Sequence, residues 1–365
     1  MLRTVLLSSA LAAAAAAQVP LQPGLTIVTA LSDREGDYES IKTVEAVTAD
    51  AVKLAYSADV PGSGGAGKAR KVTTRRTVRR EDLRSAHEYM QIFNPAAPET
   101  FAGTTAVGAS TAVLNELKTQ GRTTFAFQTP GRQPSADKIL AALAGGGAKD
   151  AKSLDDIGKQ LDASKAAGTL ERVEAAPVPF PMILNGRRTT VPAIHARGTF
   201  DEIHADFYFL DDPDNPIALK WTTGSATGAL QVVQITWPVA HAAPPIEQAL
   251  KDSGRAEVHG IYFDFGSATI KPESEPVLKE IADAMATNRA WTLNVEGYTD
   301  NVGGDAANMD LSRRRASAVK EALAARFHVD AARLATAGFG STHPKEPNDT
   351  AEGRARNRRV ELVRQ

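Results

Sequence analysis

The sequence predicts an α+β protein: a mainly β N-terminal domain with helical inserts, followed by a C-terminal βαβαβ domain in which a mixed sheet is backed by helices. Two patterns predict this fold class. Residues 18–240 contain many short runs of β-branched and apolar residues separated by turn-forming residues. Residues 256–365 alternate strand-like and helix-like runs, which is typical of a sheet covered by helices. The length of 365 residues is sufficient for roughly two or three domains.

Residues 1–17 have the pattern of a secretory signal peptide. Arg3 gives a positive start, residues 5–17 are mostly apolar, and small residues precede the expected cleavage before Gln18. The alternative, an Ala-rich cytosolic helix, would have no polar face. The apolar run is too short to span a bilayer, and no later stretch reaches about 18 apolar residues, so no transmembrane helix is expected. We therefore expect an exported protein.

The composition is ordinary for a folded globular protein and carries no strong charge bias. Hydrophobic residues make up 42% and charged residues 23% of the chain, and the formal net charge is −1. The overall charge therefore gives no reason to expect a nucleic-acid partner. The chain has no cysteine, which excludes disulfides, thiolate metal sites, a cysteine nucleophile and a lipid-modified N-terminal cysteine.

Residues 18–240 are expected to form one mainly β domain. Asn185-Gly186 lies between two extended arms, which is a strong signal for a hairpin turn. Residues 68–84 are rich in lysine and arginine. They could attract an anionic polymer or lipid, but their Thr and Val steps favour a strand whose arginines face water. Helices are expected at residues 81–93 and 110–121, with two more within residues 130–169.

No catalytic or metal-binding pattern stands out in residues 18–240. Neither the metalloprotease pattern HExxH nor the nucleophile pattern GxSxG occurs there. His195 and His204 lie on separate expected strands, where surface residues are commoner than zinc ligands. The acidic turn at residues 211–214 could bind Ca²⁺, but a solvated hairpin tip is the simpler interpretation. The sequence therefore predicts no enzyme, no cofactor and no metal site.

The C-terminal region has the clearest pattern of strands and helices. Residues 241–255 are expected to form a linker and a short helix that lead into it. Strands are expected at residues 257–265, 291–300, 333–340 and 358–365, and helices at residues 271–288, 305–327 and 350–359. In the first of these helices Val277, Ile281 and Met285 share one apolar face, which indicates a helix packed on the sheet.

Five short segments of this region form a specific pattern. They are IYFDFGSATIKPES, VEGYTDNVG, the spaced series Asn308, Leu311, Ser312, Arg315, Ala316 and Val319, ARLATAGFGSTHP, and GRARNRRVEL. In this order and spacing they resemble the OmpA-like peptidoglycan-binding domain family. Each segment alone would be a weak signal, whereas the five together are specific. The resemblance covers about residues 256–365, less than a third of the chain, and residues 18–240 match no motif that we can name.

The resemblance implies a noncatalytic site for diaminopimelate, whose side chain in the cell-wall stem peptide ends in a free carboxylate and a free ammonium. Arg315 would bind the carboxylate with its planar guanidinium, and Asp300 would bind the ammonium. Asn308 would brace the loop between them or touch the ligand. Arg358 matches a position that lines the same pocket in the family, and Thr299 would lie at a strand end on its rim.

One departure and one simpler interpretation remain. The family usually has His where this chain has Tyr298, so we expect a changed pocket wall but a retained site, because Asp300 is kept. Taken alone, Asp300 would be a turn or capping residue, and Arg315 would be a solvated helix residue. Arg313 and Arg314 are expected to be solvated in either case.

The sequence therefore predicts a noncatalytic protein of the Gram-negative cell envelope. We expect it to be periplasmic, associated with peptidoglycan and placed near the outer membrane, so that the wall tethers its N-terminal domain. Outer-membrane or other envelope proteins are candidate partners of that domain. Two alternatives stay open: a wall-anchored enzyme, such as a hydrolase, with its chemistry in residues 18–240, and an outer-membrane β-barrel formed by the same residues. The helical inserts and few aromatic residues argue against the barrel.

Overall fold

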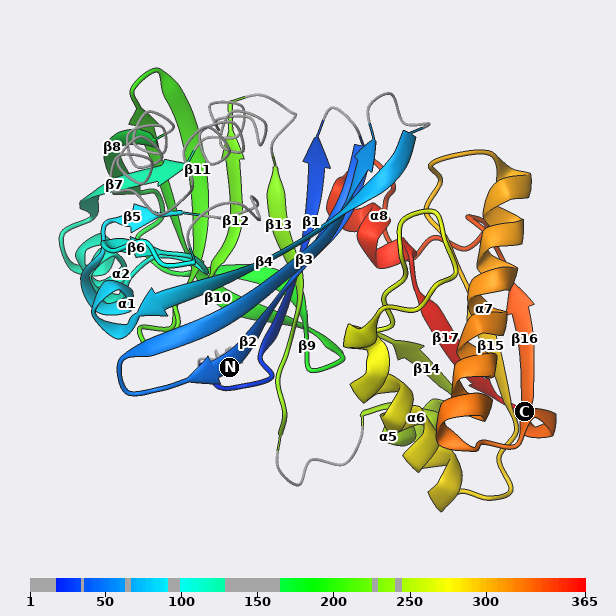
Figure 1. The fold of residues 1–365 in the computed structure, drawn as a ribbon. Coiled ribbons are helices and arrows are strands. Elements are labelled where there is room, and N and C mark those ends of the chain that lie inside the picture. Colours follow the sequence, from blue (N-terminus) through cyan, green and yellow to red (C-terminus); the bar gives the residue numbers. More distant parts are fainter. Residues whose placement is uncertain are drawn as a thin grey trace, which may run out of the picture.

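A strongly curved sheet forms the N-terminal part of the molecule, and a smaller sheet with helices forms the C-terminal part (Figure 1). We call them the N-terminal sheet and the C-terminal domain. The computed structural model describes residues 18–33, 36–62, 67–90, 99–128, 165–224, 229–239 and 245–365. Strands and helices occur in both parts, so the predicted α+β class is confirmed. The expected signal peptide and most of the two helices expected within residues 130–169 lie outside the described residues.

The N-terminal sheet has thirteen strands in the described part of the chain. They are β1 (Thr26–Asp33), β2 (Gly36–Val47), β3 (Ala51–Gly62), β4 (Gly67–Arg79), β5 (Glu88–Tyr89), β6 (Thr104–Thr105), β7 (Arg122–Gln128), β8 (Lys165–Arg172), β9 (Val178–Leu184), β10 (Arg187–Phe200), β11 (Ile203–Leu210), β12 (Ala218–Thr223) and β13 (Leu230–Thr236). Their order is β4-β3-β2-β1-β13-β12-β11-β10-β8-β7-β5-β6, and β9 pairs with both β10 and β13. Two short helices, α1 (Arg80–Ser85) and α2 (Thr111–Thr119), lie beside β5 to β8 (Figure 1).

The predicted hairpin at Asn185-Gly186 is confirmed. Both residues adopt positive φ angles, 46° and 74°, which suits the two-residue turn that matches the twist of paired strands. Strands β9 and β10 pair in antiparallel register on either side of this turn, from Leu184 and Arg187 outward. The Asn-Gly signal in the sequence therefore predicted this hairpin correctly.

Two local expectations in the N-terminal sheet need correction. The strand expected for the basic run is confirmed as β4, and Arg75 is exposed, but Arg76 is buried over the ring of Phe101 because alternate residues of the strand point into the curved sheet. The helix expected at residues 81–93 ends at Ser85. The following residues pair with β7 as strand β5, and this tertiary pairing overrides their helical spacing.

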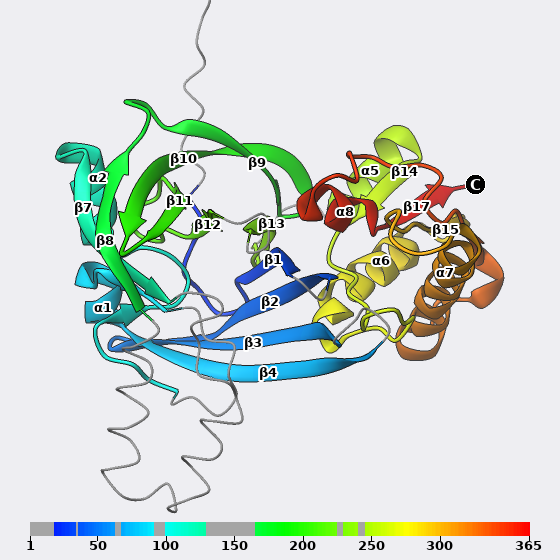
Figure 2. The same ribbon diagram turned by 90° about the horizontal axis from the view of Figure 1, so that it is seen from above.

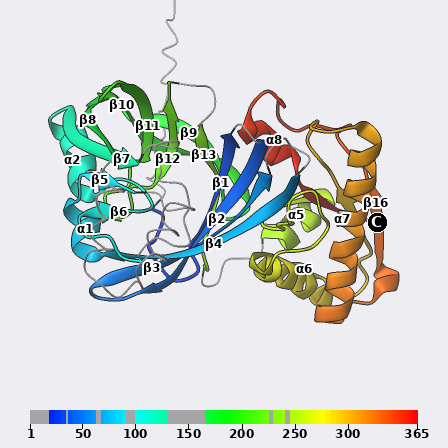
Figure 3. The same cartoon turned by 45° about the horizontal axis from the view of Figure 1, so that its top comes forward.

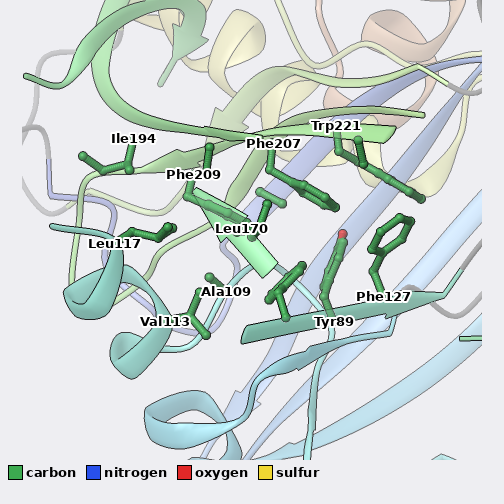
Figure 4. Packing of buried hydrophobic residues seen from close by; sticks show 14 of the residues in the cluster. Tyr89, Ala109, Val113, Leu117, Phe127, Leu170, Ile194, Phe207, Phe209 and Trp221 are labelled. Carbon is green, nitrogen blue, oxygen red and sulfur yellow. The ribbon is translucent and has the colours of Figure 1, made fainter. Parts of the chain in front are cut away.

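An aromatic core fills the inside of the N-terminal sheet (Figure 4). Phe127 and Phe207 are fully buried and meet edge to face, with 5.2 Å between ring centroids. Phe207 also stacks on Trp221 at 5.7 Å. Helix α2 packs Leu117 on this core and begins at Ser110, whose side chain accepts a hydrogen bond from the backbone of α2. The described residues of this cluster thus form a packed core inside the sheet.

The C-terminal domain contains a four-stranded mixed sheet. Its strands are β14 (Arg255–Val258), β15 (Leu293–Gly297), β16 (Leu334–Gly338) and β17 (Val360–Arg364), and its helices are α5 (Pro245–Ser253), α6 (Glu275–Thr287), α7 (Asp305–Phe327) and α8 (Ala351–Asn357), with short 3-10 turns at Pro272–Ser274 and Ala331–Arg333. The order is β14-β17-β15-β16, with only β15 and β16 parallel. Leu278 and Ile281 of α6 and Val319 and Leu323 of α7 are buried in one core.

The two parts of the molecule contact each other through β1 to β3 and helix α8, which lies beside β1 and β2 (Figures 2 and 3). Val28, Ile41 and Val233 of the N-terminal sheet form a buried cluster with Tyr262 and Ala355 of the C-terminal domain. This contact brings residues of β2 and β3 to the end of β15. In the described residues, no helix is both long enough and apolar enough to cross a bilayer.

Candidate ligand pocket at the end of β15

A pocket of about 290 Å³ opens where strand β15 ends, near the lower limit of roughly 300 Å³ for small-ligand sites. The C-terminal domain supplies most of its lining, and strands β2 and β3 of the N-terminal sheet supply the rest. All five residues that the sequence singled out line this pocket: Thr299, Asp300, Asn308, Arg315 and Arg358. The fold thus brings together side chains from the end of β15 and from the helices α7 and α8.

Asp300 lies three residues after the last residue of β15 and is almost completely buried. One carboxylate oxygen, Oδ1, accepts a hydrogen bond from the backbone of Val302 at 3.0 Å. The other, Oδ2, accepts one from Arg358 Nη1 at 2.6 Å. Asp300 therefore stabilises the turn after β15 through Val302. Its carboxylate also lines the pocket.

The loop between β15 and α7 folds back under the control of Asn308. Its Nδ2 donates to the carbonyl oxygens of Asp300 at 3.3 Å and Val302 at 3.1 Å. The hydroxyl of Thr299 donates to the Asp300 carbonyl as well, at 2.9 Å. Gly303 has a φ of +94°, which L side chains rarely adopt, and so allows the reversal. Asn308 thus braces the loop from inside α7.

Helix α7 approaches β15 closely because Gly297 has no side chain. A Cβ at this position would lie 2.2 Å from the backbone oxygen of Ser312, far inside contact distance. Ser312 is fully buried, and its hydroxyl accepts a hydrogen bond from the backbone of Gly340 at 2.9 Å. Arg315 lies almost one helical turn further along α7, so this close approach also places Arg315 at the pocket.

Arg315 lines the pocket with two donor atoms that no described protein group accepts. It is only 9% exposed, its Nε donates to the Ser267 carbonyl at 3.0 Å, and its guanidinium lies 4.8 Å from the centre of the Phe263 ring. Its Nη1 and Nη2 atoms have no hydrogen-bond partner among the described residues. Burial, reinforced by the charge of Arg358, lowers the pKa of Arg315 to about 10, so it stays protonated at neutral pH.

Arg358, at the end of α8, differs from Arg315 because both of its terminal nitrogens bind carboxylates. Nη1 binds Asp300 at 2.6 Å, and Nη2 binds Oε1 of Glu39 in strand β2 at 2.7 Å. Although burial opposes it, the charges of Glu39 and Asp300 raise the pKa of Arg358. Sequence reasoning missed Glu39, since 319 residues separate it from its partner and no motif surrounds it.

Tyr298 forms part of the pocket wall, where the family usually has His. Its ring stacks on Phe339 at 5.2 Å, and the guanidinium of Arg359 lies 3.8 Å from its centre. Its hydroxyl donates to Glu296 at 2.8 Å. Burial, together with the acceptor Glu296, raises the pKa of Tyr298 to about 12, so the ring stays neutral. Tyr298 and Asp300 both line the pocket, so the change from His leaves Asp300 in place.

The other candidates from the sequence do not form a site. His195 is buried between Glu174 and Asp206, and its ring stacks on Tyr208. His204 binds Thr199 at the surface. In the acidic turn, Asp212 accepts backbone hydrogen bonds at both carboxylate oxygens, which explains its burial. Within the described ranges, no group of three or more histidine and acidic side chains could hold a metal ion.

Sequence comparison identifies the family of this chain. Residues 262–358 match the OmpA family. "Outer membrane protein A" of Bordetella avium is 35% identical over 164 residues, which are 42% of this chain and 83% of that protein. The chain belongs to the OmpA family. The resemblance inferred from the five segments is thereby confirmed, and so is the assignment to Gram-negative outer-membrane relatives.

Other OmpA-family relatives match over shorter regions. "Outer membrane porin F" of Pseudomonas aeruginosa is 44% identical over 101 residues, which are 28% of this chain and 29% of the porin. "Peptidoglycan-binding protein ArfA" of Mycobacterium bovis is 40% identical over 103 residues, which are 28% of this chain and 31% of that protein. The chain thus spans less than a third of the length of these two relatives. By their names, these three relatives are outer-membrane or peptidoglycan-binding proteins.

Proposed function

We propose that the protein is a noncatalytic envelope protein that binds peptidoglycan through the diaminopimelate of the stem peptide and so tethers its N-terminal sheet to the wall. The observation that carries this proposal is Arg315. Most of this side chain is buried, but its two terminal nitrogens have no partner among the described residues, so they can donate to a ligand that enters the pocket. The pocket in front of it is large enough to admit the end of an amino-acid side chain.

The chemistry of the pocket matches the side-chain end of diaminopimelate. The carboxylate would accept two parallel hydrogen bonds from Nη1 and Nη2 of Arg315, the planar geometry that a guanidinium favours. The ammonium, attached to the same carbon atom, would approach the carboxylate of Asp300. A lysine side chain in the stem peptide has the ammonium alone, so it would leave Arg315 unpaired. The pocket therefore favours diaminopimelate-type walls over lysine-type walls.

The proposed place of action is the periplasm, with the wall as partner and the outer membrane nearby. The names of the relatives support this placement, since they describe outer-membrane and peptidoglycan-binding proteins. The pattern of residues 1–17 supports export. No step of bond making or breaking is proposed. Incubation with isolated sacculi should release no soluble muropeptides, and release by the purified protein would contradict the noncatalytic assignment.

Cosedimentation with purified diaminopimelate-type sacculi tests the binding proposal. Arg315→Ala and Asp300→Ala should each weaken binding on the order of 2–5 kcal/mol, about 30-fold or more, because each leaves a ligand charge unpaired. Arg314→Ala is the matched control, since Arg314 lies next in sequence but is exposed and paired with Asp310 at 2.7 Å. Lysine-type sacculi should bind poorly. Equal binding by wild type, Arg315→Ala and Asp300→Ala would refute the proposal.

A further inference from the structure

Strand β2 of the N-terminal sheet brings acidic residues to the pocket of the C-terminal domain. Asp37 forms an ion pair with Arg354, and Glu39 binds Arg358 at 2.7 Å. Asp59 of β3 lines the same pocket. We call Asp37, Glu39 and Asp59 the N-terminal wall. These three carboxylates lie far from the OmpA-family match in the sequence, so the match assigns them no role.

The N-terminal wall is anchored by contacts around Glu39. Asp59 forms an ion pair with Lys271 at 2.6 Å, and both side chains are at most 10% exposed. Ser57 Oγ donates to Glu273 of the C-terminal domain at 2.7 Å. The buried apolar cluster shared by the two parts lies beside these polar contacts. Glu39 is therefore positioned against the pocket by its surroundings and not only by its own ion pair.

Glu39 adds a second carboxylate to the one that Asp300 supplies, because Arg358 contacts both side chains. Arg358 contributes one positive charge to this group of three. Asp300, Glu39 and Arg358 together therefore carry one net negative charge, which favours a ligand ammonium. Without Glu39, the pair of Asp300 and Arg358 would be neutral.

Glu39 also keeps a free acceptor. Its Oε1 accepts from Arg358, whereas its Oε2 has no hydrogen-bond partner in the described part of the chain. The side chain is 27% exposed, so this oxygen remains accessible. Both oxygens of Asp300 already accept one hydrogen bond each, from Val302 and Arg358. An ammonium has three donors, and one free carboxylate oxygen beside Asp300 gives it a second anionic acceptor.

We propose that Glu39 completes the ammonium subsite, so that the ligand is held by both parts of the molecule and its ammonium lies between Asp300 and Glu39. This inference rests on the proposed function and adds the N-terminal sheet to the binding site. The pocket keeps its volume of about 290 Å³ with the N-terminal wall in place, so this wall borders the site without filling it. Arg358 contacts both carboxylates, which places Glu39 and Asp300 near each other in the pocket.

Isothermal titration of the full chain with two synthetic stem peptides tests the inference. One peptide ends in meso-diaminopimelate. The other ends in 2-aminopimelate, which keeps the side-chain carboxylate but lacks the ammonium. Glu39→Gln should weaken binding of the first peptide roughly tenfold to a hundredfold and leave binding of the second within about twofold. Glu45→Gln is the control, since Glu45 lies on the same strand and pairs with the exposed Arg75.

The outcomes separate this inference from the proposed function. Loss of both peptides in Arg315→Ala with unchanged binding of both in Glu39→Gln would leave the proposed function standing and overturn the role of Glu39. Tighter binding of diaminopimelate by Glu39→Gln would show that Glu39 competes with the ligand, which also overturns it. An equal loss of binding of both peptides in Glu39→Gln would show that Glu39 acts only on the structure of the pocket, and it would overturn the proposed contact with the ammonium. A wild-type chain that binds neither peptide would overturn both proposals.

Discussion

The two walls of the pocket differ in how their charges are paired. On the side of the C-terminal domain, Arg315 is nearly buried, and its terminal nitrogens have no partner among the described residues. Opposite it, Asp37, Glu39 and Asp59 of the N-terminal wall are each paired with a cation of the C-terminal domain. The paired charges connect the two parts of the molecule, whereas Arg315 carries the charge that we propose a ligand binds. Single substitutions can therefore test each side of the pocket separately.

The largest effect on the N-terminal wall is expected from Lys271→Met. This change leaves the carboxylate of Asp59 buried without its cation and should lower the free energy of unfolding by about 3–5 kcal/mol in a urea titration. Lys279→Met is the control, because Lys279 pairs with Asp283 at the same 2.6 Å but both side chains are more than half exposed. The control should cost about 0–1 kcal/mol. Equal losses would show that Asp59 and Lys271 do not hold the two parts together.

The difference between the walls also decides what the sequence could predict. Asp300, Asn308 and Arg315 belong to one short stretch whose spacing identifies the family, and the fold brings them to one pocket as predicted. Glu39 was missed because its pairing depends on how two distant parts dock, which no local pattern encodes. Tyr89 was placed in a helix for a related reason: its pairing with β7 is a tertiary contact. Local signals predicted turns and helix starts. Contacts between residues far apart in the sequence determined the pairing of Tyr89 and of Glu39, and no local signal predicts such contacts.

The next largest effect is expected from His259, which lies in the interface behind the pocket. Burial, reinforced by nearby arginines and opposed by Glu257, lowers the pKa of His259 to about 4. The unfolded chain takes up this proton near pH 6.5, so between about pH 6.5 and 4 the unfolded state binds more protons and stability falls as the pH falls. The loss from this residue should reach about 3 kcal/mol.

Urea titrations at several pH values between 7 and 4 measure this effect. His259→Asn should flatten the decrease in the free energy of unfolding over this range, because it removes the group whose protonation differs between the two states. His328→Asn is the control, since His328 is exposed and its left-handed backbone conformation is one that Asn tolerates. The same slope in both variants and in wild type would contradict the assignment of the buried histidine.

The smallest of these effects on stability is expected from Gly297→Ala, which changes only the part of the pocket that the C-terminal domain forms. The added Cβ would lie 2.2 Å from the Ser312 oxygen, so α7 must move away from β15, at a cost of about 1–3 kcal/mol. Because Arg315 follows Ser312 on the same helix, binding to sacculi should weaken as well. Gly224→Ala, whose added Cβ would meet only one atom at 3.9 Å, should change stability by about 0.5 kcal/mol or less and leave binding unchanged. Gly297→Ala could lower stability and still keep full binding. In that case the position of Arg315 would not depend on the contact between α7 and β15. Its contacts with Phe263 and Ser267 would then hold the guanidinium in place.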